Sequence, residues 1–260
     1  MVRILLLLNL FFAGYLFSDI DIAGGEAYLD GKWKVIKDIQ INELRIRHLR
    51  QTKGQDSRLC VSGNYDVVDL VGPINPDTSD VIERILSSSN NRCIIKSKMT
   101  LQECVDDGTT LWLCKRAIKD KNHLMIPMMI YMSSGGGYLK SGFDLGEILR
   151  NHYTWTLIPW NSTCASSCAT AFLGGNIRRM EKGSSILFHA PYNYGLSKSY
   201  TKPAVICHEE NYMLKEYMIF MLGKKDGQRV YKRTMDFCSP NGGWQLNPDA
   251  GFIYNINMFE

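Results

Sequence analysis

The chain has 260 residues, 45% of them apolar and 22% charged, so it can bury a sizeable core in one large domain or in one domain with an appendage. Its formal net charge of +4 is mild, and its basic residues form no stripe interleaved with aromatic ones. We therefore expect no nucleic-acid partner.

Residues 1–18 have the features of an export signal. Arg3 supplies a positive start, and an apolar run from Ile4 to Phe17 follows before the acidic Asp19. This run is shorter than the roughly 20 apolar residues that a membrane-spanning helix needs. We expect a periplasmic or secreted protein with no integral membrane segment after signal removal. Retention of the uncleaved signal as an anchor stays open.

Residues 19–60 are interpreted as an N-terminal extension. Apolar and polar residues alternate at 33–36 and 39–42, which is typical of strands. The polar stretch at 54–57 marks the end of this extension. Residues 61–260 are then expected to form the main domain.

The main domain begins with an α/β pattern. A strand is predicted at 67–71, followed by a helix around 81–86 with apolar residues at helical spacing. Residues 88–123 are polar and contain cysteines, which indicates an inserted loop or small subdomain. The nearly continuous apolar run at 125–132 is typical of a parallel strand that is covered on both faces.

Strands and helices continue to alternate along the chain. Helices are predicted at 138–150 and 165–173, and strands at 155–159 and 185–189. This order indicates an α/β fold with a mostly parallel sheet. Ligands of such folds bind beyond the carboxyl ends of the strands.

Eight cysteines follow the predicted signal: Cys60, Cys93, Cys104, Cys114, Cys164, Cys168, Cys207 and Cys238. An even and fairly high count behind a signal fits an oxidising compartment and several disulfide bonds. Their pairing cannot be obtained from the sequence. Cys104 and Cys114 are able to close a local loop. Cys164 and Cys168, one helical turn apart, are also consistent with small buried residues.

Three groups of residues at the ends of predicted strands or the starts of predicted helices have the chemistry that acyl transfer needs. Ser166 offers a hydroxyl nucleophile, His189 offers a base, and the glycines at 135–137 offer backbone N–H groups for an oxyanion. Each feature also has a plain structural interpretation: a serine that caps a helix, a tight glycine turn, and a structural histidine. Their order and spacing together favour the catalytic interpretation.

A third group is expected to orient His189 and to stabilise its cation. Asp236 is the predicted acid, and the alternatives are Asp249, Glu209 and Glu210. The segment from His208 begins like the zinc motif H-E-x-x-H, but Tyr212 stands where the second histidine is required. We therefore expect neither a metal nor another cofactor.

These residues resemble the Clp protease proteolytic-subunit family of the ClpP/crotonase-like superfamily. Ser134–Gly137 with Gly142 is similar to its oxyanion loop S-P-G-G-x4-G, with Gly135 in place of the proline. Residues 165–167 are similar to its nucleophile turn A-S-M, and residues 189–191 to its H-Q-P. The likeness covers residues 66–87 and 124–191, and the extension and the insertion have no counterpart.

The resemblance implies a fold of repeated β-β-α units around a mostly parallel sheet, and a Ser–His–Asp peptidase. Ser166 would attack a peptide carbonyl, His189 would take and return the proton, and the N–H groups of Gly136 and Gly137 would hold the oxyanion. The chain looks closest to exported Clp-like proteins, which implies an ATP-independent enzyme acting on short or unfolded peptides. It also implies a homo-oligomer. The apolar stretch 207–222 is then either an interface helix or a helix that packs on its own sheet.

Two other functions stay open. One is a catalytically inactive relative that binds partners or acts as a scaffold in the cell envelope. The other is a crotonase-like enzyme that polarises the carbonyl of an acyl thioester. The pairing of Ser166 with His189 and the export signal both disfavour the thioester enzyme.

Overall fold

A computed structural model describes residues 33–51, 60–62, 66–88, 93–95, 125–126, 128–195, 204–207, 209–239 and 241–258. The predicted signal at 1–18 lies outside the described residues, as do the predicted local loop of Cys104 and Cys114 and residues 96–123 of the predicted insertion.

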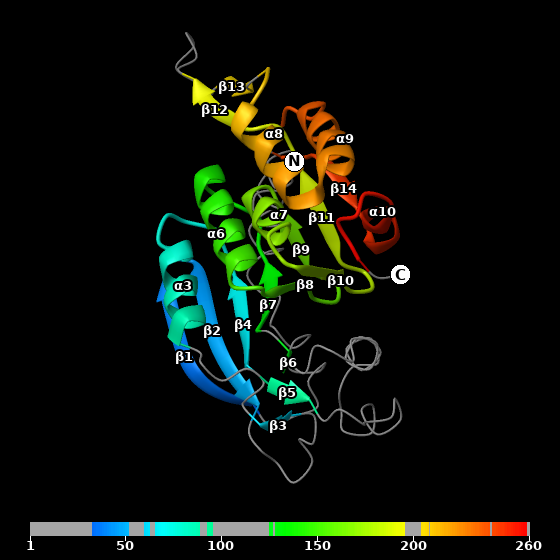
Figure 1. Cartoon of the computed structure of the whole chain (residues 1–260). Helices are drawn as coiled ribbons and strands as arrows, with labels where there is room; N and C mark the ends of the chain where they lie inside the picture. The colour runs from blue at the N-terminus through cyan, green and yellow to red at the C-terminus, as the bar shows by residue number, and fades with distance from the viewer. Residues whose placement is uncertain are drawn as a thin grey trace, which may run out of the picture.

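The elements are labelled in chain order (Figure 1). The strands are β1 Trp33–Ile41, β2 Leu44–Gln51, β3 Cys60–Ser62, β4 Asp66–Val71, β5 Cys93–Ile95, β6 Met125–Ile126, β7 Met129–Ser133, β8 Trp155–Ile158, β9 Thr163–Ala165, β10 Ile177–Met180, β11 Ser185–Phe188, β12 Tyr192–Gly195, β13 Ala204–Cys207 and β14 Trp244–Leu246. The helices are α3 Thr78–Ser88, α6 Leu139–Asn151, α7 Ser167–Phe172, α8 Tyr212–Leu222, α9 Lys224–Met235 and α10 Pro248–Ile253.

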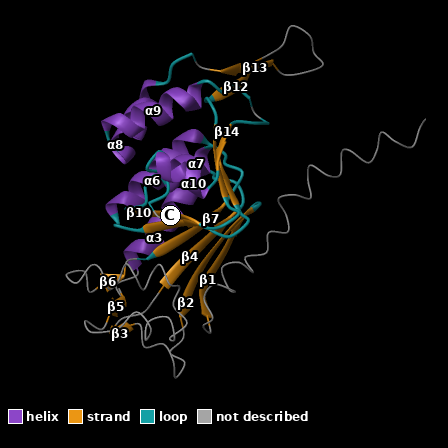
Figure 2. Ribbon diagram, turned by 90° about the vertical axis from the view of Figure 1, so that its right-hand side faces the viewer, coloured by secondary structure: helices purple, strands orange, loops and turns teal. Residues whose placement is uncertain are grey.

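The largest sheet has the strand order β1-β2-β4-β7-β8-β10. Its strands β4, β7, β8 and β10 run parallel, and β1 and β2 add an antiparallel hairpin at one edge. The helices gather on one side of this sheet, as Figure 2 shows. The predicted α/β class with a mostly parallel sheet is confirmed.

A second, smaller sheet has the strand order β14-β11-β9, and two of its strands directly follow strands of the large sheet along the chain. β8 of the large sheet is followed by β9 of the small sheet and then by α7, and β10 is followed by β11. β7 is extended in the same way, because Ser134 forms a bridge to Cys164 before α6 begins. These successions are the expected β-β-α units.

The core lies between the large sheet and its helices. α3 presents Val81, Ile82 and Ile85 to it at helical spacing, as predicted. Phe172 of α7 and Phe188 of β11 are completely buried at the junction with the small sheet. This dense packing holds the ends of β7, β9 and β11 in place, and the glycine loop, Ser166 and His189 follow those ends.

Three predicted elements differ in their bounds. The apolar run at 125–132 contains two strands, β6 and β7, which belong to different sheets because β6 pairs with β5 and β7 pairs with β4 and β8. The helix predicted at 165–173 begins only at Ser167, since Thr163–Ala165 pair with β11 as β9. The stretch 207–222 becomes helical at Tyr212, after β13 ends at Cys207.

The segment interpreted as an extension supplies β1 and β2 of the large sheet. At the other end of the domain, β12 and β13 form a hairpin that projects beyond α8 and α9 (Figure 1). A disulfide between Cys207 and Cys238 ties this hairpin to the segment after α9. Within the described ranges, no helix combines the length and the apolar character needed to cross a membrane.

Candidate active site

Ser166 lies in a sharp turn between β9 and α7. Its backbone has φ 57° and ψ −123°, a conformation that side-chain-bearing residues rarely adopt and that costs about 1–3 kcal/mol. A strained strand-to-helix turn of this kind lifts a nucleophilic serine out of the surrounding backbone. The side chain of Ser166 is partly exposed, whereas that of the neighbouring Ser167 is fully buried. Ser166 is therefore the accessible hydroxyl of the pair.

Strand pairing brings His189 to this turn. β9 runs parallel to β11 with Ala165 opposite Leu187, and the N–H of Ser166 donates to the carbonyl of Leu187 at 2.8 Å. β11 ends at Phe188, so His189 is the first residue beyond the strand that pairs with the nucleophile strand. No hydrogen bond joins Ser166 Oγ to the His189 ring in the described part of the chain. Such contacts are often long until a substrate binds.

The ring of His189 is held by its own segment. Its Nδ1 lies 3.0 Å from the carbonyl oxygen of Ala190, and its ring centroid is 5.4 Å from that of Tyr192. A carbonyl oxygen accepts only, so Nδ1 carries the hydrogen and donates to Ala190. In the neutral ring this tautomer has its lone pair on Nε2, as a general base for a serine requires.

The backbone segments of Asp236 and His189 are joined by a hydrogen bond, but the Asp236 carboxylate makes no hydrogen bond to the His189 ring. The N–H of Ala190 donates to the carbonyl of Phe237 at 2.8 Å, which ties the neighbours of the two residues together. The Asp236 side chain is half exposed, and its Oδ2 accepts from Arg233 at 3.4 Å. The alternative acids are exposed and make no hydrogen bond to His189: Glu209, Glu210 and Asp249.

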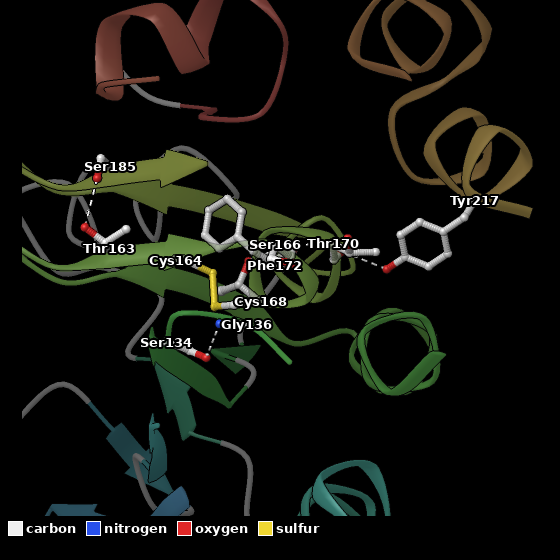
Figure 3. The surroundings of a disulfide bond; sticks show 11 residues. Ser134, Gly136, Thr163, Cys164, Ser166, Cys168, Thr170, Phe172, Ser185 and Tyr217 are labelled. Atoms are coloured by element: carbon white, nitrogen blue, oxygen red, sulfur yellow. Dashed lines mark hydrogen bonds between the residues drawn. A yellow bond between two sulfur atoms is a disulfide. The ribbon is translucent and has the colours of Figure 1, made fainter. Parts of the chain in front are cut away.

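The glycine loop lies directly against the nucleophile (Figure 3). Gly136 has φ 102°, and a Cβ built on it would lie 2.6 Å from the Cβ and 3.2 Å from the Oγ of Ser166. Only glycine permits this backbone conformation and this close approach. The loop therefore places backbone N–H groups beside the serine hydroxyl.

The individual N–H groups of this region differ in availability. The N–H of Gly136 donates to Ser134 Oγ at 3.0 Å. Neither Gly137 nor Ser167 donates its N–H to another group among the described residues. The N–H of the residue after a nucleophilic serine is a common oxyanion donor. Gly137 and Ser167 are thus the donors free to hold an oxyanion in this conformation.

Ser134 connects the glycine loop to the nucleophile strand. Its N–H donates to the carbonyl of Thr163, and its carbonyl accepts from the N–H of Ala165, both at 2.9 Å. Its buried hydroxyl accepts from Gly136. Hydrogen bonds thus join the loop to the strand that leads into the turn of Ser166.

A disulfide spans the nucleophile turn. Cys164 of β9 is bonded to Cys168 of α7, with their Cα atoms 5.3 Å apart and both side chains fully buried (Figure 3). Of the two interpretations left open by the sequence, the structure selects the bond.

The far end of α7 is anchored by buried polar side chains. The Tyr217 hydroxyl donates to the carbonyl of Thr170 at 2.9 Å, and Arg150 donates to the carbonyl of Leu173 at 2.9 Å. Arg178 donates to the carbonyls of Gly175 and Asn255. Burial raises the pKa of Tyr217, and burial together with the nearby Arg150 lowers the pKa of Arg178 to about 10. Both groups thus keep their hydrogens at neutral pH and hold α7 in place.

Sequence reasoning missed Ser134 and Ser167 as parts of the site. Ser134 begins the glycine loop and Ser167 follows the nucleophile, so their positions were visible in the motifs. The direction of the Ser134 hydroxyl and the freedom of the Ser167 N–H depend on how strands pair, which only the structure shows.

No protein-family model matches this sequence, and no curated protein matches it. Among solved structures, a mutant of the 1510-N membrane-bound stomatin-specific protease superposes with a TM-score of 0.44 and 14% identity, over 74% of this chain and 75% of that chain. A ClpP1 mutant from Listeria monocytogenes has a TM-score of 0.44 and 12% identity, over 74% of this chain and 88% of that chain. A second 1510-N mutant, in complex with a substrate peptide, has a TM-score of 0.44 and 14% identity, over 74% and 71% of the two chains. Likeness at this level of identity and superposition carries no inference about the chemistry of this chain.

Proposed function

We propose that this chain is an exported serine peptidase of the ClpP-like type, which cleaves short or unfolded peptides without ATP. Ser166 supports the proposal most directly, because a strained, partly exposed serine lies against a glycine loop at the end of two paired strands. His189 follows the partner strand and has its Nε2 lone pair available. Nucleophile, base and oxyanion donors thus come from adjoining segments.

The reaction would follow the serine-hydrolase sequence. Ser166 Oγ bonds to the carbonyl carbon of the peptide while its proton passes to His189 Nε2. The carbonyl electron pair moves to the oxygen, which the N–H groups of Gly137 and Ser167 would stabilise. His189 then protonates the leaving amine, and a water molecule hydrolyses the acyl-serine by the same steps in reverse. Removal of one oxyanion donor typically costs about 10²–10³-fold in kcat.

The N–H of Gly136 is also proposed as an oxyanion donor. It is held by the Ser134 hydroxyl in this structure, so its use requires that hydroxyl to rotate away when substrate binds. Export is proposed from the signal-like residues 1–18, and the bonds Cys164–Cys168 and Cys207–Cys238 are consistent with an oxidising compartment.

The test of this function is labelling of the purified, disulfide-bonded protein with a fluorophosphonate probe. Covalent labelling at Ser166, mapped by mass spectrometry, is the expected result. A folded protein that does not label at all would instead favour a binding or scaffold role. The pairing of Asp236 with Arg233 and of Gly136 with Ser134 is what favours that second candidate.

Asp236 is proposed to complete the triad by turning from Arg233 to His189. The pair with Arg233 is half exposed and 3.4 Å long, so breaking it costs little. Asp236→Asn is expected to lower kcat by about 10⁴-fold, because the histidine would lose the group that stabilises its cation. Steady-state peptide hydrolysis measures this, with Arg233→Ala as the control that frees the carboxylate. An unchanged kcat would leave the Ala190 carbonyl as the group that orients His189.

Self-association through α8 is part of the proposal. One side of this helix packs into the core with Tyr217, Met218 and Met221. The other side exposes Tyr212, Met213 and Phe220, which are 74%, 67% and 67% accessible. Lys215 and Glu216 are the charged residues of this helix. Exposed apolar side chains gathered on one side of a helix are typical of a contact surface, and a second copy of the chain would cover them.

Phe220→Glu is therefore expected to convert an oligomer into a monomer, since a charge would enter the apolar contact. Light scattering coupled to size-exclusion chromatography measures the mass. Ile253→Glu, a charge at a 65% exposed apolar residue of α10, is the matched control and should leave the mass unchanged. A wild-type chain that is monomeric at high concentration would exclude this interface.

A further inference from the structure

The disulfide between Cys164 and Cys168 forms a short covalent ring around the turn of Ser166. One sulfur comes from β9 and the other from the first turn of α7, with the serine midway between them. Both cysteines have no exposed surface, so neither can touch a substrate. Any effect of this bond on chemistry must act through the positions of Ser166 and of the Ser167 N–H, which lie between the two cysteines.

The side chain of Ser166 does not help to keep the turn in its conformation. Ser166 is the N-cap residue of α7 but makes no side-chain cap hydrogen bond, and its φ of 57° is unfavourable for a serine. α7 spans only Ser167–Phe172, and a helix this short has little stability of its own. The N–H of Ser166 donates to the carbonyl of Leu187, and the carbonyl of Ser166 accepts from the N–H and the hydroxyl of Thr170. These hydrogen bonds hold the turn at its two ends, and the disulfide is the covalent link across it.

The geometry points to the Cys164–Cys168 bond as the device that holds Ser166 in its reactive conformation, an inference that rests on the proposed peptidase function. With the bond closed, Cys164 and α7 are covalently joined across the turn, so the turn cannot relax toward an ordinary φ without moving Cys164 or α7, which are buried in the core. The hydroxyl then stays against the Gly136 loop. The two cysteines are positioning residues, and full reactivity of the serine requires their oxidation.

The first test removes the bond with the double substitution Cys164→Ala and Cys168→Ala. The rate of fluorophosphonate labelling is expected to fall at least about tenfold at a temperature where circular dichroism shows the variant folded. Cys207→Ala with Cys238→Ala removes a disulfide that is remote from Ser166 in the sequence and serves as the matched control. An unchanged labelling rate in the first variant, or an equal fall in the control, would overturn the inference.

The second test does not depend on activity. Ser166→Gly is expected to raise the Tm of the disulfide-bonded protein by about 3 °C, because glycine relieves the strain of a positive φ. In the Cys164→Ala, Cys168→Ala background the same change is expected to raise the Tm much less, since the turn has already relaxed. An equal gain in both backgrounds would overturn the inference. A wild-type protein that does not label but shows this coupling would refute the peptidase function while leaving the role of the bond in place.

Discussion

Ser166→Ala is expected to abolish fluorophosphonate labelling and to lower kcat for peptide hydrolysis by about 10³–10⁶-fold. The reason is that Ser166 is the partly exposed hydroxyl of the turn, while Ser167 is completely buried. His189→Ala should lose a similar factor. The double variant should be no worse than either single one, because the two residues act as a unit. Labelling followed by intact-mass spectrometry measures the first effect, and initial rates measure the second.

The control for this experiment is Ser184→Ala. The Ser184 hydroxyl is buried and has no hydrogen-bond partner among the described residues, so its removal breaks no hydrogen bond. This variant should label and hydrolyse like the wild type. If Ser166→Ala still labels, or if His189→Ala keeps the wild-type rate, the site is not a serine–histidine site.

Gly136→Ala is expected to reduce labelling by at least about 10²-fold and to lower the Tm. The new methyl group would lie 2.6 Å from the Ser166 Cβ and 2.7 Å from the Ala165 carbonyl oxygen. The φ of 102° is also unfavourable for alanine. The loop must therefore move away from Ser166, and the N–H groups of Gly136 and Gly137 would move with it.

Gly242→Ala provides a matched glycine control. Among the described residues beyond its chain neighbours, a Cβ at Gly242 would meet only Ser239 Oγ, at the ordinary distance of 3.8 Å, so neither labelling nor the Tm should change. A Gly136→Ala variant that labels like the wild type would show that the loop does not contribute to the site.

The parts of the candidate site that short sequence patterns specify could be predicted. The run ending at Ser133, the glycines after it and the small residues around Ser166 each specify an element within a few residues. The location of His189 at the end of a strand followed from the same kind of pattern, and the structure has β11 end immediately before it.

What sequence could not provide depends on contacts between distant segments. Thr163–Ala165 pair with β11 although the small residues there also suit a helix, so tertiary pairing decides the outcome. The Cys164–Cys168 bond requires the strand and the helix to meet at an angle that spacing alone does not specify. The direction of the Asp236 carboxylate depends on whether it pairs with Arg233 or with His189, and the sequence does not indicate which partner it takes.

The edge strand β1 affects how this protein behaves at high concentration. An exposed edge offers unpaired backbone groups to a neighbouring chain, and Val35 and Ile36 on this edge are 50% and 39% accessible. The ladder between β1 and β2 shifts register between Val35 and Lys37, and lysines 34 and 37 are exposed there. A bulge and positive charges are the means by which natural sheets stop growing. Among the described residues, β1 thus covers the edge of β2 and carries the two features that disfavour pairing with a strand of another chain.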